Sequence, residues 1–466
     1  MDKTTAELAS YADRATSAPL PDDVVHEAKR RLVDTLGCAL GGFDSPPARV
    51  ASSLADNYQI QDGARVLGLE RRAPADVAAF ANCVMVRYLD FNDSFASAHV
   101  SGGHPSDMIP AVMAVADANR CSGESTIRGV VAAYQSNASV PVPFKQRGWD
   151  QGIMVGIGSV VGSSVVLGLD RDRIANAISL AVTPSVPLRV SRSGELSMWK
   201  ACATAAAARS AVFATQLAAK GMTGPDQPFE GRHGLWEQVS GEFALDLDPE
   251  RVGYRITDAD TKLYPVEGGA QSVIPALLTL TEGLSVDDIE AVHVRTYWGL
   301  WFEAASEPEK WDPQTRETAD HSLPYVMAIA IRDRNLTLRA FDDATIADPT
   351  LRPLMSRIQV TEVPEFTGDN PTLLGPTEIE VRTTAGERRI GRTEVARGNH
   401  RNPMSDEELN QKFLGLGVAV AEEDRCQALL DQLWSFEATQ DIRPVVDAWA
   451  DLVGQGAASA RELPGG

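Results

Sequence analysis

Residues 152–169 read GIMVGIGSVVGSSVVLGL, eighteen residues without a charge. This length lies at the lower edge of what spans a bilayer. The stretch contains five glycines and three serines, and charged residues flank it on both sides. The glycine pairs Gly152/Gly156 and Gly158/Gly162 allow helices to approach closely in a soluble bundle as well as in lipid. Because no other segment could span a membrane, we predict a buried core helix and no membrane association.

Helical patterns extend outward from this stretch. A helix is expected to begin at Pro21 and to carry Ala28, Leu32 and Leu36 on one face, with Gly41-Gly42 at its end. Alanine-rich helical runs follow at residues 77–89, 108–118, 173–182 and 197–220. Such alanine density is typical of closely packed helices, so the first half of the chain is predicted to form a helix bundle.

The pattern changes near Pro265. Residues 291–297 and 358–361 alternate in the manner of strands, and residues 378–395 resemble a hairpin turning at Ala385-Gly386. Helix returns after Ser405, which resembles a capping residue. We therefore predict a mostly α fold. A helical bundle domain of residues 1–265 and 401–455 is interrupted by a smaller α/β (α+β) lid domain at residues 266–400, and residues 456–466 form a disordered tail.

Charge and cysteine content restrict the partners. The net charge of −21 argues against nucleic acid and anionic membranes as partners. An anionic substrate therefore needs a local basic pocket. The five cysteines are scattered without a CxxC pair, which fits a reducing compartment and argues against a zinc ribbon or a disulfide framework. Since the N-terminus has no signal pattern, we expect a cytoplasmic protein.

The segments DFNDS (90–94) and GHPSD (103–107) are the most informative for function. With the polar loop between them they bring Asp90, Asp93, His99 and His104 close in sequence, although the chain has only seven histidines. His104 is expected at the entrance of a helix, and histidine with a carboxylate partner suits proton transfer near neutral pH. Two alternatives stay open at this point: a metal site formed by Asp and His, and aspartates that only cap helix ends.

Cationic residues lie further along the chain. Arg189 and Arg192 precede Lys200, which is expected at the start of a long helix. A lysine there opposes the helix dipole, which favours a functional role, although it could also be a surface lysine lying over Trp199. Lys262 and Glu267 fall at the expected domain junction, where clefts form. Further on, Asp320 and His321 could be a plain cap and a satisfied buried histidine.

Nine short motifs together resemble the MmgE/PrpD family, which includes 2-methylcitrate dehydratase, cis-aconitate decarboxylase and iminodisuccinate epimerase. In chain order they are LVDTLG (32–37), LDFND (89–93), GHPSD (103–107), RGWD (147–150), SMWK (197–200), GMTGP (221–225), KLYP (262–265), ADHSLPY (319–325) and NPMS (402–405). The resemblance implies a helical domain split by an α/β lid, a homodimer, an active site between the domains, and no metal or organic cofactor. Family active-site positions fall on Asp90, Ser94, His104, Asp150, Lys200, Glu267 and Tyr297.

The chain departs from the family pattern at several positions. Decarboxylases look to have histidine where this chain has Asp150 and Glu267, so decarboxylation is less favoured. Dehydratases look closer, but they carry a side chain where this chain has Gly269, and Gln151 stands where related chains often have histidine. Because Gly269 offers no side chain, we expect the pocket to hold a different or bulkier acid.

From these residues we predict a cofactor-independent lyase that removes water from a citrate-like hydroxy polycarboxylate. The predicted catalytic residues are His104, Asp90, Lys200 and Glu267, with His104 as the main proton-transfer group, oriented by Asp90 through a hydrogen bond that the carboxylate accepts. The predicted substrate-binding residues are Asp93, Ser94, Asp150, Arg189, Arg192, Lys262, Tyr297 and His321. The alternatives are a cis-aconitate-type decarboxylase, an epimerase or isomerase of an acidic substrate, and an inactive binding or scaffold protein.

Overall fold

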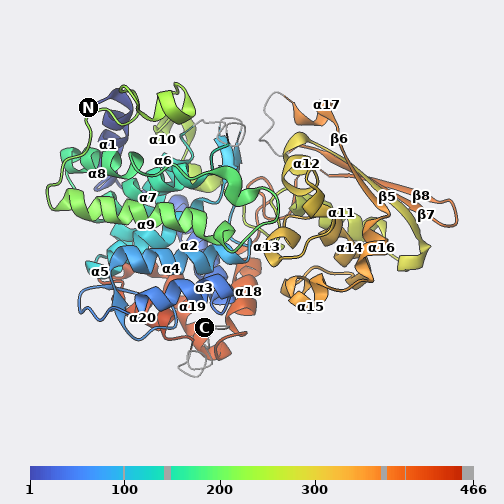
Figure 1. The fold of residues 1–466 in the computed structure, drawn as a ribbon. Helices are drawn as coiled ribbons and strands as arrows, with labels where there is room; N and C mark the ends of the chain where they lie inside the picture. Colours follow the sequence, from blue (N-terminus) through green and yellow to red (C-terminus); the bar gives the residue numbers. More distant parts are fainter. Residues whose placement is uncertain (98–99, 141–147, 369–374, 394, 454–466) are drawn as a thin grey trace.

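The computed structural model describes residues 1–97, 100–140, 148–368, 375–393 and 395–453. Most of these residues are helical, and strands form one small sheet and two short hairpins, which confirms a mostly α chain with a smaller α/β part. Figure 1 shows a helical lobe beside a smaller lobe that carries the sheet. The predicted tail at residues 456–466 lies outside the described residues.

The helical lobe draws on both ends of the chain. Its N-terminal helices are α1 (Lys3–Ala15), α2 (Asp22–Gly42), α3 (Pro46–Ala55), α4 (Ala75–Tyr88), α5 (Ile109–Ala118), α6 (Gly123–Asn137), α7 (Gly152–Val166), α8 (Arg171–Val182), α9 (Trp199–Ala219) and α10 (Pro249–Val252). The chain returns to it with α18 (Asp406–Gly417), α19 (Glu423–Trp434) and α20 (Arg443–Ala450). One hydrophobic core joins these segments, from Leu8 in α1 to Val453 after α20.

The uncharged stretch forms α7, and every residue of this helix is buried. Its glycines permit the close packing that the sequence predicts. A Cβ at Gly162 would lie 2.6 Å from the carbonyl oxygen of Gly129 in α6, and one at Gly158 would lie 2.8 Å from that of Ala133. Within the described part of the chain, no helix is both long enough and apolar enough to cross a membrane. The prediction of a core helix is therefore confirmed.

The smaller lobe contains a four-stranded sheet and short helices. Its elements are α11 (Ala270–Leu280), β5 (Ile289–Thr296), α12 (Trp298–Ala304), α13 (Arg316–Ala319), α14 (Leu323–Asp333), α15 (Asp343–Ile346), α16 (Leu351–Met355), β6 (Ile358–Glu362), α17 (Pro364–Thr367), β7 (Thr377–Thr383) and β8 (Arg388–Thr393). The strand order is β6-β5-β7-β8, with β5 and β6 parallel and the other pairs antiparallel.

Alternation of side chains explains this sheet. Val292 of β5 lies between Ile358 of β6 and Val381 of β7, and all three are buried on the face that packs on the helices. The intervening His293 pairs with Glu380 on the opposite face. Because successive strand residues point to opposite faces, this pattern places one face against α11 and α14.

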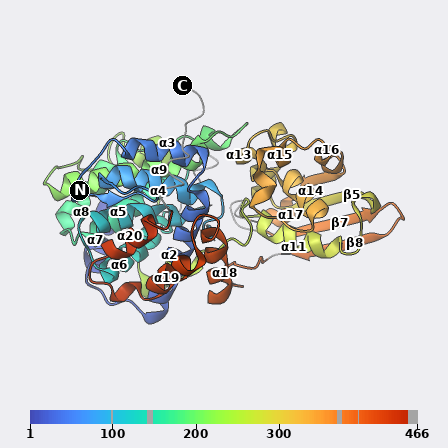
Figure 2. The same cartoon turned by 90° about the horizontal axis from the view of Figure 1, so that it is seen from below.

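The two lobes have separate hydrophobic cores. The second core runs from Val266 to Val381, and the lobes lie side by side in both views (Figures 1 and 2). The chain enters the smaller lobe after Lys262 and leaves it before Asn399. The domain boundaries given above stay a prediction.

One local expectation is wrong. The polar loop between the two acidic motifs contains an antiparallel hairpin of β3 (Phe95–Ser97) and β4 (Val100–Gly103), in which Phe95 pairs with Gly103. Backbone pairing stabilises this hairpin, and no apolar alternation signals it in the sequence. A second hairpin joins β1 (Ala64–Arg65) and β2 (Arg72–Ala73). The helix after His104 begins as a single 3-10 turn, η1 (Pro105–Met108), before α5.

Candidate active site

Asp90 lies two residues after the end of α4 and has a left-handed backbone conformation, φ +51°. Aspartate tolerates this region better than most residues, and non-glycine residues held there often mark functional sites. The side chain is fully buried and three cations surround it. Arg87 Nη1 lies 2.6 Å and Lys262 Nζ lies 2.7 Å from Oδ1, and Lys200 Nζ lies 3.6 Å from Oδ2.

The smaller lobe completes this cluster. Lys200, in the first turn of α9, also forms an ion pair with Asp320. His321 Nδ1 lies 2.6 Å from Asp320 Oδ1 and 3.1 Å from Asp90 Oδ2. We call Arg87, Asp90, Lys200, Lys262, Asp320 and His321 the Asp90 centre. It brings four of the predicted residues together: Asp90, Lys200, Lys262 and His321.

Burial and charge shift the pKa values within the centre. Burial alone would raise the pKa of Asp90, but Arg87, Lys262 and Lys200 outweigh it and hold that pKa well below its usual range. Burial lowers the pKa of Lys200 and of Lys262, and the nearby aspartates oppose this effect. Burial and Lys200 lower the pKa of His321 to about 4. His321 is therefore neutral at pH 7, and three cations face two carboxylates.

His104 lies beside this centre and is partly exposed. Its Nδ1 is 2.6 Å from the backbone carbonyl oxygen of Asp93, and its Nε2 is 3.7 Å from Asp90 Oδ1. Because a carbonyl oxygen can only accept, Nδ1 carries the proton of the neutral ring and Nε2 has a free lone pair. Burial, with Arg87 and Lys262, holds the pKa of His104 well below its usual value, so the ring is neutral at pH 7.

The predicted hydrogen bond between His104 and Asp90 is wrong. His104 Nε2 and Asp90 Oδ1 are 3.7 Å apart, which is too far for a hydrogen bond. Oδ1 of Asp90 instead accepts from Arg87 and Lys262. The backbone of Asp93 orients His104 instead. The carboxylate of Asp93 accepts from the Ser106 backbone N–H at 2.9 Å and from the Tyr134 hydroxyl at 2.7 Å, which fixes the loop. These bonds occupy both of its oxygens, so its predicted substrate contact stays a prediction.

Three further predicted residues meet at the junction of the lobes. A Cβ on Gly268 would lie 3.9 Å from the hydroxyl of Ser94. The neighbouring Glu267 accepts from the backbone N–H of Gly269 at 2.6 Å. A Cβ on Gly269 would lie 2.5 Å from the Tyr297 hydroxyl and 3.1 Å from Glu267 Oε2. The Tyr297 hydroxyl therefore occupies space that a side chain at position 269 would need, and the expectation of a different or bulkier acid stays a prediction.

Asp150, Arg189 and Arg192 form a separate group of ion pairs. Arg192 Nε lies 2.6 Å from Asp150 Oδ2, and Arg189 lies 2.7 Å from Glu303 of α12. Burial would raise the pKa of Asp150, but Arg192 outweighs it and lowers that pKa. Both guanidinium groups already pair with protein carboxylates, so their predicted contact with substrate stays a prediction. Arg189 instead ties the two lobes together.

Sequence reasoning missed two members of the Asp90 centre. Arg87 lies three residues before Asp90, one helical turn away, and this spacing is a usable signal for an ion pair. Asp320 was interpreted as a possible cap, but its carboxylate pairs with Lys200 and His321. Asp107 also lies close, with Oδ2 3.8 Å from Arg87 Nε, and burial raises its pKa to about 6.

One group of residues could hold a metal ion. In the described segments, Asp90, Asp320 and His321 have ligand atoms within 4.8 Å of one another. Both carboxylates, however, already pair with lysine ammonium groups, and Arg87 adds a third cation. A divalent ion would meet strong repulsion there. The donor set therefore fits a metal poorly, and His99 lies outside the described residues.

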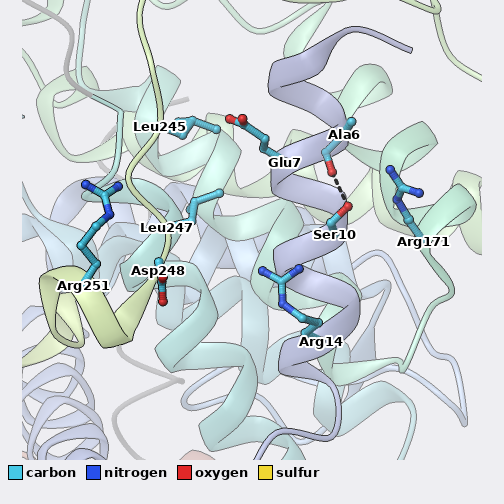
Figure 3. Close-up of a pocket in the computed structure, with 9 residues that line it drawn as sticks. All are labelled: Ala6, Glu7, Ser10, Arg14, Arg171, Leu245, Leu247, Asp248 and Arg251. Atoms are coloured by element: carbon cyan, nitrogen blue, oxygen red, sulfur yellow. Dashed lines mark hydrogen bonds between the residues drawn. The ribbon is translucent and has the colours of Figure 1, made fainter.

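A surface hollow of about 370 Å³ lies elsewhere, along α1 (Figure 3). Arg14, Arg171 and Arg251 line it, but Glu7 and Asp248 line it as well. The three guanidinium groups do not converge in Figure 3, and Arg251 pairs with Asp246 at 2.6 Å. The Asp90 centre is therefore the better candidate for chemistry.

A neutral, partly exposed histidine beside a buried cluster of cations is typical of enzymes that move protons on anionic substrates. Comparison with known proteins agrees with this class. The model of the MmgE/PrpD N-terminal domain matches residues 6–248, and that of the MmgE/PrpD C-terminal domain matches residues 264–435. The chain therefore belongs to the MmgE/PrpD family.

Several relatives have named activities. A 2-methylcitrate dehydratase of Cupriavidus necator is 29% identical over 394 residues, covering 78% of each chain. That of Escherichia coli (strain K12) is 28% identical over 400 residues, covering 79% of each. A cis-aconitate decarboxylase of Homo sapiens is 23% identical over 445 residues, covering 91% of this chain and 89% of its own. These names indicate a lyase-type enzyme.

Proposed function

We propose that this chain is a metal-independent lyase that removes water from a citrate-like hydroxy polycarboxylate. The observation that carries this proposal is that His104, whose Nε2 is unprotonated, lies next to the three cations of the Asp90 centre. The first group supplies a base and the second supplies attraction for an acid anion. In a chain of net charge −21, a local group of cations is what an anionic substrate needs.

His104 is the proposed base. Nε2 takes the proton from the carbon next to a substrate carboxylate, while the Asp93 carbonyl holds the ring by Nδ1 and stabilises the imidazolium that forms. The electron pair of that C–H bond becomes the new C=C bond as the hydroxyl leaves. Negative charge that builds on the substrate carboxylate is offset by Lys200 and Lys262.

The departing hydroxyl needs a proton, and Lys200 and Glu267 are the proposed donors. Burial lowers the pKa of Lys200, which makes its proton easier to release. Glu267 lies on the smaller-lobe side, where the Gly269 N–H holds its Oε2, and it donates in its protonated, carboxylic acid form. Lys200→Met and Glu267→Gln distinguish the two, because only loss of the true donor slows a substrate with a poor leaving group more than one with a good leaving group.

Activity on a panel of acids tests the proposal. The purified protein is incubated with 2-methylcitrate, citrate and related hydroxy acids, and alkene formation is followed by ultraviolet absorbance. We expect at least one hydroxy acid to give an alkene. Release of carbon dioxide from cis-aconitate would instead favour decarboxylation. Proton exchange without alkene formation would favour epimerisation, and binding of an acid without turnover would favour the scaffold role.

A further inference from the structure

Lys412 in α18 contacts both chain segments that build the Asp90 centre. Its Nζ donates to the backbone carbonyl oxygen of Phe91 at 2.8 Å and to that of Lys262 at 2.9 Å. The first carbonyl belongs to the residue after Asp90, and the second belongs to the lysine that pairs with Asp90. The side chain of Lys412 is 6% exposed. Figure 2 shows α18 at the edge of the helical lobe that is nearest the smaller lobe.

Asp34 fixes the position of this lysine. Its Oδ1 lies 2.6 Å from Lys412 Nζ, and its side chain is 1% exposed. The ring of Phe91 lies 3.9 Å from the same nitrogen and adds a cation–π contact. An ammonium group has three donors, of which two go to the carbonyls, while Asp34 supplies the opposite charge as an ion pair. Asp34 belongs to the motif LVDTLG (32–37), to which the proposed chemistry assigns no role.

These contacts hold a strained turn. Asp90 has a positive φ, a backbone conformation that residues other than glycine adopt uncommonly. The carbonyl oxygen of Asp90 accepts from Lys262 Nζ at 2.9 Å, and the next carbonyl, of Phe91, accepts from Lys412. Two buried lysines, Lys262 and Lys412, therefore donate to consecutive backbone carbonyls of the turn that places the Asp90 side chain among its cations.

We infer that Lys412 is a positioning residue, which clamps the segments of Asp90 and Lys262 together, and that Asp34 holds it in place. Without the clamp, both segments relax and the Asp90–Lys262 pair at 2.7 Å loosens. The effect of the clamp on turnover rests on the proposed function. The effect of the clamp on the pKa of His104 does not rest on it, because this pKa is measured without substrate.

The variants separate positioning from stability. Lys412→Met alone leaves Asp34 buried with an uncompensated charge, which lowers stability. The double variant Lys412→Met/Asp34→Asn removes that charge while the carbonyl contacts stay missing. A matched control is Lys29→Met/Glu437→Gln. Lys29 donates to the Trp434 carbonyl at 2.9 Å and pairs with Glu437 at 2.7 Å, but contacts neither site segment.

Three readouts are compared: the melting temperature, kcat on the best acid of the panel, and the pKa of His104 from NMR of histidine-labelled protein. We expect the double variant to regain most of the melting temperature that Lys412→Met loses. We expect its kcat to stay about tenfold to a hundredfold below wild type, as for other small misplacements of catalytic groups. The pKa of His104 should rise in the double variant. Lys262 lowers this pKa in the wild type, and its ammonium group lies further from His104 once the clamp is lost.

The control pair should leave kcat and the pKa of His104 unchanged. Recovery of both melting temperature and kcat in the double variant would overturn the inference and leave Lys412 a purely structural residue. An unchanged pKa of His104 would overturn it as well. If wild type turns over no acid, the proposed function fails, but a raised pKa of His104 in the double variant still supports the clamp.

Discussion

Two segments that contain aspartate and histidine, one from each lobe, meet at the Asp90 centre, and their histidines have different hydrogen-bond partners. In the helical lobe, His104 bonds through Nδ1 to a backbone carbonyl and keeps Nε2 available beside Asp90. In the smaller lobe, His321 directs Nδ1 at the carboxylates of Asp320 and Asp90 and is more deeply buried. A carbonyl partner fixes the tautomer without adding charge, whereas carboxylate partners make the ring part of a charge network. The difference supports the proposed role of His104 in proton transfer, while the predicted substrate contact of His321 stays a prediction.

Removal of His104 should have the largest effect. We expect His104→Ala to lower kcat by about 10²–10⁴-fold, the usual contribution of a general base, with little change in melting temperature. Steady-state kinetics on the best substrate measures it. The control is His293→Ala, a histidine on the exposed face of β5 that bonds to Thr361. A kcat within threefold of wild type for His104→Ala would exclude it as the base.

Neutralising Asp90 should have an intermediate effect on turnover and a large one on stability. In Asp90→Asn, Arg87, Lys262 and Lys200 lose their shared carboxylate inside the protein. Breaking a buried ion pair lowers the free energy of unfolding by about 3–5 kcal/mol. We expect a kcat between those of His104→Ala and wild type, measured well below the melting temperature, with denaturant unfolding alongside. Loss of kcat without loss of stability would contradict the role of Asp90 as the neutralising partner of its cations.

His321 should affect stability against pH more than turnover. Its folded pKa is about 4, below the unfolded value of about 6.5, so the unfolded chain binds more protons between these values. The free energy of unfolding should therefore fall as pH decreases from about 6.5 to 4. His321→Asn should reduce this slope and lower kcat by less than about tenfold, since the residue is not the proposed base. A slope equal to wild type, measured by denaturant unfolding at several pH values, would show that His321 does not titrate as described.

Chelation should have the smallest effect, because the Asp90 centre repels a divalent ion. We expect unchanged kcat after treatment with a strong chelator and dialysis, and only a mild loss in His99→Ala. Activity assays with and without added zinc measure both. Sensitivity to the chelator, rescue by zinc and equal severe losses at His99 and His104 would restore the metal alternative.

The sequence predicts part of the fold and part of the candidate site. Alternation along residues 291–297 predicted β5, and the spacing of apolar residues predicted α2, because both patterns are local. Asp90, Lys200, Lys262 and His321 were chosen as site residues, and the structure places them together. Motif order along the chain predicted the family, which the two matching domain models confirm.

The remainder depends on geometry that no local pattern encodes. The spacing of Arg87 and Asp90 indicates one ion pair, but no local pattern shows that Lys262 also donates to Asp90, so the hydrogen bond between Asp90 and His104 was predicted wrongly. The sequence also does not show that the Tyr297 hydroxyl, from the residue after β5, lies where a side chain at position 269 would be. The hairpin of β3 and β4 depends on backbone pairing across a turn rather than on side-chain alternation.

Exchange of the substrate proton with deuterated water tests the central claim most directly. The claim is that Nε2 of His104 removes the proton next to a substrate carboxylate. Wild type and His104→Gln are incubated in deuterated water with the best hydroxy acid, and the recovered substrate and product are examined by mass spectrometry. The account predicts that wild type forms alkene and places deuterium in the recovered acid, and that His104→Gln does neither at a comparable rate. Exchange by His104→Gln at the wild-type rate would contradict it.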